Sequence, residues 1–476
     1  MATVFQMSYA DELIPMPAGT PMGGYGWGVD GGETYRQSGG TVANELKVRC
    51  AIIVDSGGRR IVFVQADVIS IPRHVYTDVV GRLVGQGVIP NASSFVLAQS
   101  HTHSGPMIGD KPDPYVMLNS KRAVDVARTY TAGFVDQVVR VAVKAHQTPR
   151  TGVTLGYAEG FAELGVNRRG LSWRPREVPV LVARRADNFD LFAVLAGHAC
   201  HPVCVDRNAN PDSEYCGYAM IETGKRLGVP VMFFQGAAGD INPAAPDPGR
   251  LPIESAALRL TNAIVATVRN AAYFPVNGPI NTAIETVPLP YRVNVGDAAQ
   301  REWLRGEYQK RVDAAGPDGG KWGSGDSATV RHAERMVEEL KNPVLGHMPM
   351  TIQKIDLGGL TILTMSHEVL SGWHVGTKNQ WAAKKPFEPL WVMAYTNHID
   401  CYVPAFDILR DGDAGGQGEA GWRNDRPDDD KGLSGNSTYA VSYSLASPLN
   451  AGENAQDPNG VEGRLQPRIR ALLNIE

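Results

Sequence analysis

The sequence predicts an α/β fold in which mixed β-sheets are flanked by helices. Apolar runs rich in β-branched residues alternate with longer segments whose apolar residues recur every three or four positions. Some of the strand-like runs follow each other after a short turn, as around Asn188, which indicates antiparallel pairs within the sheets. The chain of 476 residues, with 43% hydrophobic and 20% charged residues, has the composition of a globular protein.

The expected elements follow from these runs in chain order. Residues 60–71 and 93–100 predict buried strands, and residues 74–87 between them predict a helix that ends at a glycine. The apolar spacing over 122–147 predicts a long amphipathic helix. The later elements are paired strands at 178–185 and 189–200, a helix at about 214–227, a strand at 230–236, a helix at about 253–272, strands over 350–368 with a turn at Gly358-Gly359, a helix, a strand at 390–396 and a short final helix.

No linker or repeat divides the chain, so we expect a single catalytic domain over residues 1–476. Residues 298–342 are charged and helical, with a glycine-rich tip at 316–327, and predict a helical excursion that is either a surface hairpin or a lid. Residues 407–437 are acidic, rich in glycine and without period, and predict a long loop.

Composition excludes several classes of partner and predicts a cytoplasmic enzyme that acts on a small molecule. The formal net charge of -4 gives no reason to expect binding to nucleic acid or to an anionic membrane. The first twenty residues lack the pattern of a signal peptide, and no run is apolar and long enough for a transmembrane segment. Five cysteines, an odd number, are typical of reduced thiols rather than a disulfide framework. The sequence leaves the oligomeric state open.

Three familiar motifs do not account for the function. Glycines at 26, 28 and 31 match Gly-x-Gly-x-x-Gly, but they follow proline- and glycine-rich sequence rather than a strand, which argues against a dinucleotide site. No Walker A motif and no Gly-x-Ser-x-Gly elbow is present.

Histidines end two of the predicted strands. His101 and His103 stand one residue apart, so in an extended chain they face the same side. His198 and His201 end the strand at 189–200, and the proline after His201 stops it there. Each pair is either a metal site or a set of polar residues that satisfies the backbone at a strand end.

Three more strands end in residues suited to metal binding or catalysis. The loop "GAAGDINP" (236–243) contains small residues that let backbone N–H groups approach an oxygen closely, together with Asp240 and Asn242. Glu368 lies just past an apolar run, at the end of the strand-like stretch "LTILTMSHE" (360–368). The stretch "YTNHIDCYVP" (395–404) ends another predicted strand. Five strand ends of this kind predict one site at one edge of a sheet. A structural zinc held by Cys200, Cys204 and Cys216 is a weaker alternative, because a second cysteine pair is missing.

Taken in order, these stretches resemble the neutral/alkaline (non-lysosomal) ceramidases, a family of zinc-dependent amidohydrolases. The resemblance is carried by motifs between about residues 10 and 410: "PMGGYG" (21–26), "SHTHSGP" (100–106), Asn167-Arg168, "ACHPV" (199–203), "GYA" (217–219) and "GDINP" (239–243). It implies one zinc ion per chain, with His101, His201, Glu368 and Tyr402 as ligands. It also implies that His103 moves protons and that Arg168 binds a substrate oxygen.

The departures from the family pattern shape the expected activity. Asn242 stands where the family has serine, so a serine nucleophile is excluded there and zinc-activated water is favoured. The family's C-terminal immunoglobulin-like domain, a secretion signal and a helix for docking on a bilayer are not recognisable. We therefore expect hydrolysis of an amide (N-acyl) bond in a soluble substrate rather than in ceramide.

In the expected mechanism, the catalytic residues are His103, Arg168, Asp240 and Asn242. Histidine has an unperturbed pKa of about 6.5, which suits proton transfer. Arg168 and the N–H groups of residues 236–240 would stabilise the oxyanion, and Asp240 would orient a ligand or His103.

Three alternatives to an amidase remain open. The first is a hydrolase of glycosidic, ester or lactone bonds, with sugar stacking on tryptophans such as Trp27, Trp173, Trp373 and Trp422. The second is a metal-binding protein without catalysis, and the third is a structural subunit.

Overall fold

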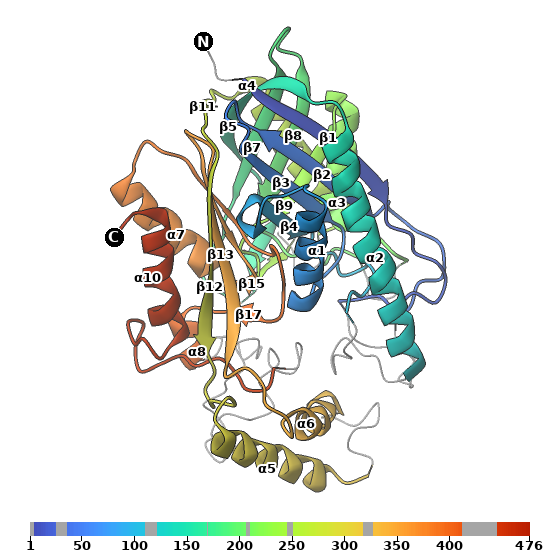
Figure 1. Ribbon diagram of the computed structural model, residues 1–476, viewed down its shortest axis with the longest axis vertical. Helices are drawn as coiled ribbons and strands as arrows, with labels where there is room; N and C mark the ends of the chain where they lie inside the picture. The colour runs from blue at the N-terminus through green and yellow to red at the C-terminus, as the bar shows by residue number, and fades with distance from the viewer. Residues whose placement is uncertain are drawn as a thin grey trace.

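The fold is built from two β-sheets and the helices that cover them, as the α/β expectation required (Figure 1). The computed structural model describes residues 4–24, 36–109, 121–168, 170–205, 210–244, 251–317, 327–411 and 445–476. Its helices are α1 (Arg73–Gly85), α2 (Lys121–Gln147), α3 (Glu214–Leu227), α4 (Ile253–Asn270), α5 (Ala298–Ala315), α6 (Ser327–Glu339), α7 (Ser371–Lys384), α8 (Phe406–Asp411) and α10 (Val461–Leu473).

The larger sheet has nine strands in the order β4-β3-β2-β1-β5-β7-β8-β9, with β11 paired to β5. Only the pairs β3–β4 and β8–β9 are parallel, so antiparallel pairing is more extensive than the alternation of strands and helices suggested. The strands are β1 (Phe5–Leu13), β2 (Lys47–Val54), β3 (Arg60–Ala66), β4 (Phe95–Gln99), β5 (Thr151–Phe161), β7 (Glu177–Arg185), β8 (Leu191–His198), β9 (Val231–Gln235) and β11 (Phe274–Val276).

The second sheet has the order β12-β13-β14-β16, and two short pairs complete the strands. Its strands are β12 (Asn281–Pro290), β13 (His347–Asp356), β14 (Thr361–Met365) and β16 (Leu390–Met393), and the short pairs join β6 (Gly165–Asn167) to β10 (Ile241–Pro243) and β15 (Glu368–Val369) to β17 (Tyr402–Val403).

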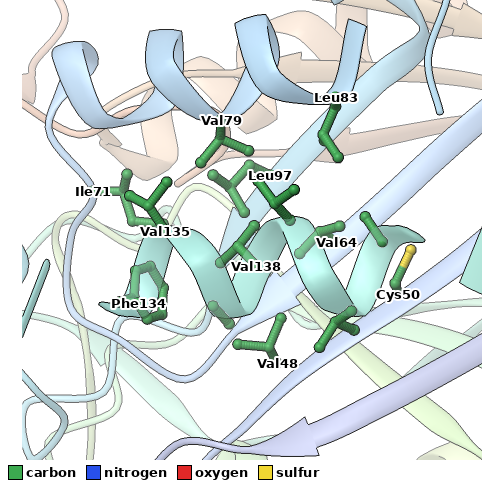
Figure 2. Close-up of a cluster of buried hydrophobic side chains, with 14 of the residues drawn as sticks. Val48, Cys50, Val64, Ile71, Val79, Leu83, Leu97, Phe134, Val135 and Val138 are labelled. Atoms are coloured by element: carbon green, nitrogen blue, oxygen red, sulfur yellow. The ribbon is translucent and has the colours of Figure 1, made fainter. Parts of the chain in front are cut away.

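Side chains on the two faces of the large sheet enter different cores, because successive residues of a strand point to opposite sides. In β3, Val62 and Val64 pack under α1 and α2, whereas Ile61 and Phe63 pack toward the second sheet. Figure 2 shows the first of these cores, where Val138 of α2 lies among side chains of the sheet and of α1. The strands therefore need apolar residues on both faces, and their continuous apolar runs follow from that.

Residues 394–397, just after β16, form hydrogen bonds with both outermost strands of the large sheet, β4 and β9. The N–H of Ala394 donates to the carbonyl of Gln235 in β9 at 2.9 Å, and the N–H of Asn397 donates to the carbonyl of Leu97 in β4 at 2.6 Å. The carbonyl of Tyr395 also accepts from the N–H of Gln99 at 3.0 Å. This segment, which we call the seam, brings the ends of β4, β9 and β16 to one place.

The predicted helical excursion at 298–342 contains α5 and α6, which have a small core of their own that includes Leu304, Tyr308 and Met336. The predicted loop at 407–437 begins as helix α8 instead, and its remainder from residue 412 lies outside the described residues. No helix in the described ranges has both the length and the apolarity needed to cross a bilayer.

Candidate metal centre

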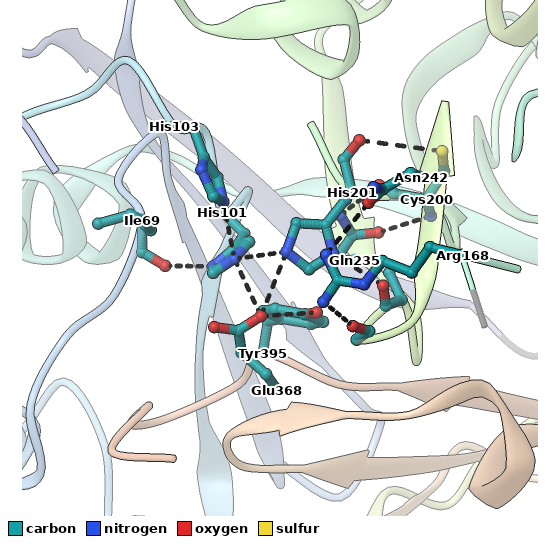
Figure 3. A network of polar contacts seen from close by, with 12 residues as sticks. Ile69, His101, His103, Arg168, Cys200, His201, Gln235, Asn242, Glu368 and Tyr395 are labelled. Atoms are coloured by element: carbon teal, nitrogen blue, oxygen red, sulfur yellow. Dashed lines mark hydrogen bonds and ion pairs between the residues drawn. The ribbon is translucent and has the colours of Figure 1, made fainter. Parts of the chain in front are cut away.

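Two histidines from different strand ends meet at the seam (Figure 3). The Nε2 atoms of His101, which follows β4, and His201, which follows β8, lie 3.2 Å apart, and both side chains are buried. The Nδ1 atom of His101 lies 2.7 Å from the carbonyl of Ile69, and that of His201 lies 2.8 Å from the carbonyl of Ala238. A carbonyl can only accept, so each Nδ1 carries the proton and each Nε2 presents a lone pair.

The carboxylate of Glu368 meets the same two lone pairs. Its Oε2 lies 3.2 Å from Nε2 of His101 and 3.3 Å from Nε2 of His201. Three atoms with free electron pairs therefore converge. A single proton could form a hydrogen bond between only two of these atoms and would leave the third without a donor. Ligand atoms around a tetrahedral zinc with bonds of about 2.0–2.1 Å are about 3.3–3.4 Å apart, which fits this triangle.

Electrostatics keep this group ready to bind a cation. Burial opposes the ionisation of Glu368, whereas a positive charge on His101 or His201 would hold its pKa well below the usual value. Burial lowers the pKa of His201 to about 4, so its imidazole is neutral at physiological pH. Neutral imidazoles and an ionised carboxylate are the ligand forms that a divalent metal requires.

His103 lies on the edge of the same cluster and is partly buried. Its Nε2 is 3.3 Å from Nε2 of His101, and the ligand nitrogens of these two residues and His201 lie within 4.8 Å of one another. Burial, assisted by His101 and His201, lowers the pKa of His103 well below its usual value. The pKa of His103 therefore lies below the ordinary histidine value of about 6.5, and without a metal its imidazole is neutral at physiological pH.

The backbone around the cluster adopts rare conformations. The φ values of His101, Tyr395 and Asn397 are 65°, 55° and 64°. Residues other than glycine seldom adopt this left-handed conformation. Residues of this kind often gather at functional sites.

Tyr395 is a site residue that sequence reasoning missed. Its hydroxyl donates to Oε2 of Glu368 at 3.3 Å, and its buried ring lies 4.6 Å from the ring of His101. The ring of Tyr402, the tyrosine expected to bind the metal, lies 6.0 Å from Cζ of Arg168. In the sequence, "YTN" (395–397) is typical of the end of a strand and does not indicate where Tyr395 points. The turn at the seam directs its side chain toward Glu368.

Arg168 reaches the cluster from the short strand pair β6–β10. Its Nη1 donates to Oδ1 of Asn242 at 3.3 Å, and its Nη2 donates to the carbonyl of Gly239 at 2.5 Å. Register pairs Asn242 with Val166, which brings these two sequence motifs together. Asn242 therefore supports the arginine that the sequence predicted would bind a substrate oxygen.

Asp240 is fully buried, and its hydrogen bonds join two elements. Its carboxylate accepts from the backbone N–H of Ser371 at 2.7 Å, from the hydroxyl of Ser371 at 2.9 Å and from Nδ2 of Asn167 at 2.8 Å. These bonds tie the start of α7 to the turn that carries Arg168. In this arrangement the carboxylate supports Arg168 through Asn167, rather than His103 as one expectation had it.

Two of the backbone donors expected to form an oxyanion hole are already used within the protein. The N–H of Gly236 donates to the carbonyl of His198 at 2.9 Å, and the N–H of Gly239 donates to the carbonyl of Val369 at 3.0 Å. The prediction was wrong for these two groups, because the loop needs them to pack against β8 and β15.

A second histidine cluster contains His367 and His398, but its nitrogens are engaged by protein groups. His367 has its Nε2 3.0 Å from the carbonyl of Pro349, and its Nδ1 accepts from the N–H of Asp400 at 3.0 Å. His398 contacts Oδ2 of Asp400 at 2.6 Å and the hydroxyl of Thr351 at 2.9 Å. All three groups lie within 4.8 Å of one another, yet the hydrogen bonds explain the arrangement without a metal.

The weaker sequence alternatives gain no support. No cysteine belongs to the clusters of metal-competent side chains in the described ranges, so Cys200, Cys204 and Cys216 do not form a thiol site there. Trp373 is buried, whereas Trp173 is 40% exposed, and Trp27 and Trp422 lie outside the described residues.

The fold is an α/β fold like that of the neutral ceramidases, and histidines and a carboxylate gather where strand ends of its two sheets meet. Two solved structures support that assignment over 94% of this chain and 76% of each of theirs. The crystal structure of neutral ceramidase from Pseudomonas aeruginosa matches with a TM-score of 0.64 and 17% identity. A ceramidase complexed with C2 matches with a TM-score of 0.65 and 16% identity.

No family model matches the chain, and neither does any curated protein sequence. The likeness to ceramidases is therefore a likeness of fold, and the expected fold is confirmed.

Proposed function

We propose that this protein is a hydrolase with one zinc ion per chain, which cleaves the amide bond of a small N-acyl substrate. The observation that carries the proposal is the convergence of the lone pairs of His101 and His201 on the carboxylate of Glu368. The likeness of fold to ceramidases and the matched motifs favour an amide over other acyl bonds.

The proposed ligands are His101, His201, Glu368 and Tyr402, and the hydroxyl of Tyr395 donates to the carboxylate of Glu368. The carbonyls of Ile69 and Ala238 fix the tautomers of the histidines, which sets both lone pairs toward the ion. Bound zinc would lower the pKa of a coordinated water toward about 7 and so supply a nucleophile at neutral pH.

The chain's own residues would manage the proton and the developing charge. His103, held neutral by burial, would accept a proton and return it to the leaving amine. Arg168, positioned by Asn242 and Gly239, would bind the carbonyl oxygen as it gains negative charge. Loss of one such donor typically slows a reaction by about 10²–10³-fold.

The test is the metal content of the purified protein by elemental mass spectrometry. We expect about one zinc per chain in the wild type, with loss in His101→Ala, His201→Ala and Glu368→Gln. His74→Ala, which removes an exposed histidine on α1, is the matched control and should keep its zinc. A folded wild type without stoichiometric metal would refute the proposal.

A substrate panel then tests the bond. Turnover of N-acyl amines, absent in His103→Ala with zinc retained, would support the amidase. Turnover only of esters, lactones or glycosides would replace it with one of the other hydrolases, and metal without turnover on any substrate would indicate a binding protein.

A further inference from the structure

The segment Asp212–Glu214, which leads into α3, lies between the two loops that carry the histidines. On one side it contacts the loop of His101 and His103. The hydroxyl of Thr102 donates to the carbonyl of Asp212 at 2.6 Å, and the N–H of Asp212 donates to the carbonyl of Ser104 at 2.9 Å.

On the other side the segment contacts the loop that follows His201. The carboxylate of Glu214 accepts from the backbone N–H of Cys204 at 3.0 Å and from that of Val205 at 2.9 Å. It also accepts from the N–H of Tyr215 at 3.3 Å. The hydrogen bonds from Cys204 and Val205, which are successive residues, fix the direction of the loop just beyond His201.

Glu214 occupies this place at an energetic cost to the fold. Its side chain is 0% exposed, and no lysine or arginine of the described residues forms an ion pair with it. Burial raises its pKa to about 7. Its φ of 61° is also rare for a residue other than glycine. A buried carboxylate on strained backbone persists where the surrounding structure depends on its contacts.

We propose that Glu214 is a positioning residue for the metal centre, which holds the loop of His201 against the segment that also holds the loop of His101. Together with Asp212 it forms a bridge between the two loops. The bridge sets the separation of the two imidazoles, although Glu214 touches neither. The inference rests on the metal centre proposed above.

The test measures zinc affinity of the full chain by competition with a chelator. Glu214→Gln keeps the size of the side chain but replaces one acceptor oxygen by an NH₂ group, so the bonds to Cys204 and Val205 cannot both remain. We expect zinc binding to weaken by about 10–100-fold, as for other residues that orient metal ligands. Glu222→Gln, on the same helix and in a surface ion pair with Arg226, is the matched control.

A second variant opens the bridge from the other side. Thr102→Val removes the hydroxyl bond to Asp212 at nearly constant volume, and it should also weaken zinc binding. Because both variants break one bridge, the double variant should lose less affinity than the product of the two single losses. The absorption spectrum of the Co²⁺-loaded protein should change in Glu214→Gln and remain unchanged in Glu222→Gln, because the ligand geometry moves only in the first.

The outcomes separate the two proposals. Zinc affinity of Glu214→Gln within twofold of wild type, or multiplicative losses in the double variant, would overturn the bridge and leave the metal centre intact. If Glu214→Gln does not fold, wild-type affinity in Thr102→Val would overturn the bridge by itself. A wild type that binds no zinc would overturn both proposals.

Discussion

Replacing Asp240 by alanine should lower the free energy of unfolding by about 1–4 kcal/mol. The substitution leaves the buried N–H of Ser371 without an acceptor and removes the strongest bond of Asn167. An unsatisfied buried donor costs about 1–3 kcal/mol, and a carboxylate at a helix N-terminus contributes about 0.3–1 kcal/mol. Asn167 keeps a bond to the carbonyl of Trp173 at 3.1 Å, so its loss is only partial.

Urea unfolding followed by tryptophan fluorescence measures this loss in the metal-free protein. Asp187→Ala, in an exposed turn, is the control and should change the free energy of unfolding by less than about 0.5 kcal/mol. Because Asp240 supports Arg168 rather than the metal ligands, Asp240→Ala should keep its zinc while its turnover falls. A loss of stability below about 1 kcal/mol would show that these hydrogen bonds do not hold α7 to the site, contrary to our reasoning.

Three further predictions concern single positions. Tyr395→Phe should weaken zinc binding, because the hydroxyl of Tyr395 donates to Oε2 of Glu368 at 3.3 Å; unchanged affinity in the chelator assay would contradict this. Gly24→Ala should reduce turnover at least tenfold, since a Cβ there would lie 2.6 Å from Cα of His103 and the φ is 111°; unchanged kinetics would refute it. Burial raises the pKa of Glu214 from 4.5 to about 7, so the folded chain binds the extra proton in that interval and stability falls as pH rises through it. Urea unfolding of the metal-free chain should show a shallower fall in Glu214→Gln, by up to about 1.4 kcal/mol per pH unit, and identical slopes would disprove the assignment.

The candidate metal centre was predictable from sequence to the extent that its parts are local. His101 and His201 each follow an apolar run directly, so the pattern places them at strand ends where ligands gather. Glu368 also follows its strand within a few residues. The contacts among these residues confirm that the three strand ends meet. The prediction of one edge of one sheet was wrong, because β4 and β8 belong to the large sheet whereas Glu368 follows β14 of the second sheet.

The parts that sequence did not predict depend on backbone turns and distant partners. Tyr395 points inward because the seam turns at positive φ, and no local pattern encodes that turn in a non-glycine residue. Asp240 bonds to Ser371 and Asn167, which lie far from it in the sequence. A short motif specifies that a carboxylate is present, but only the tertiary structure decides which groups it contacts.

The seam has a consequence for the order of events during folding. His101, His201 and Glu368 lie far apart along the chain, and residues 394–397 join β4 to β9 beside them. We expect the three side chains to meet only after this join has formed. Contacts of such long sequence separation form late, because the entropy of closing the intervening loops opposes them. A metal ion therefore cannot nucleate this fold as zinc does in a zinc finger. Metal uptake during refolding should instead report the last stage, when the sheet has closed.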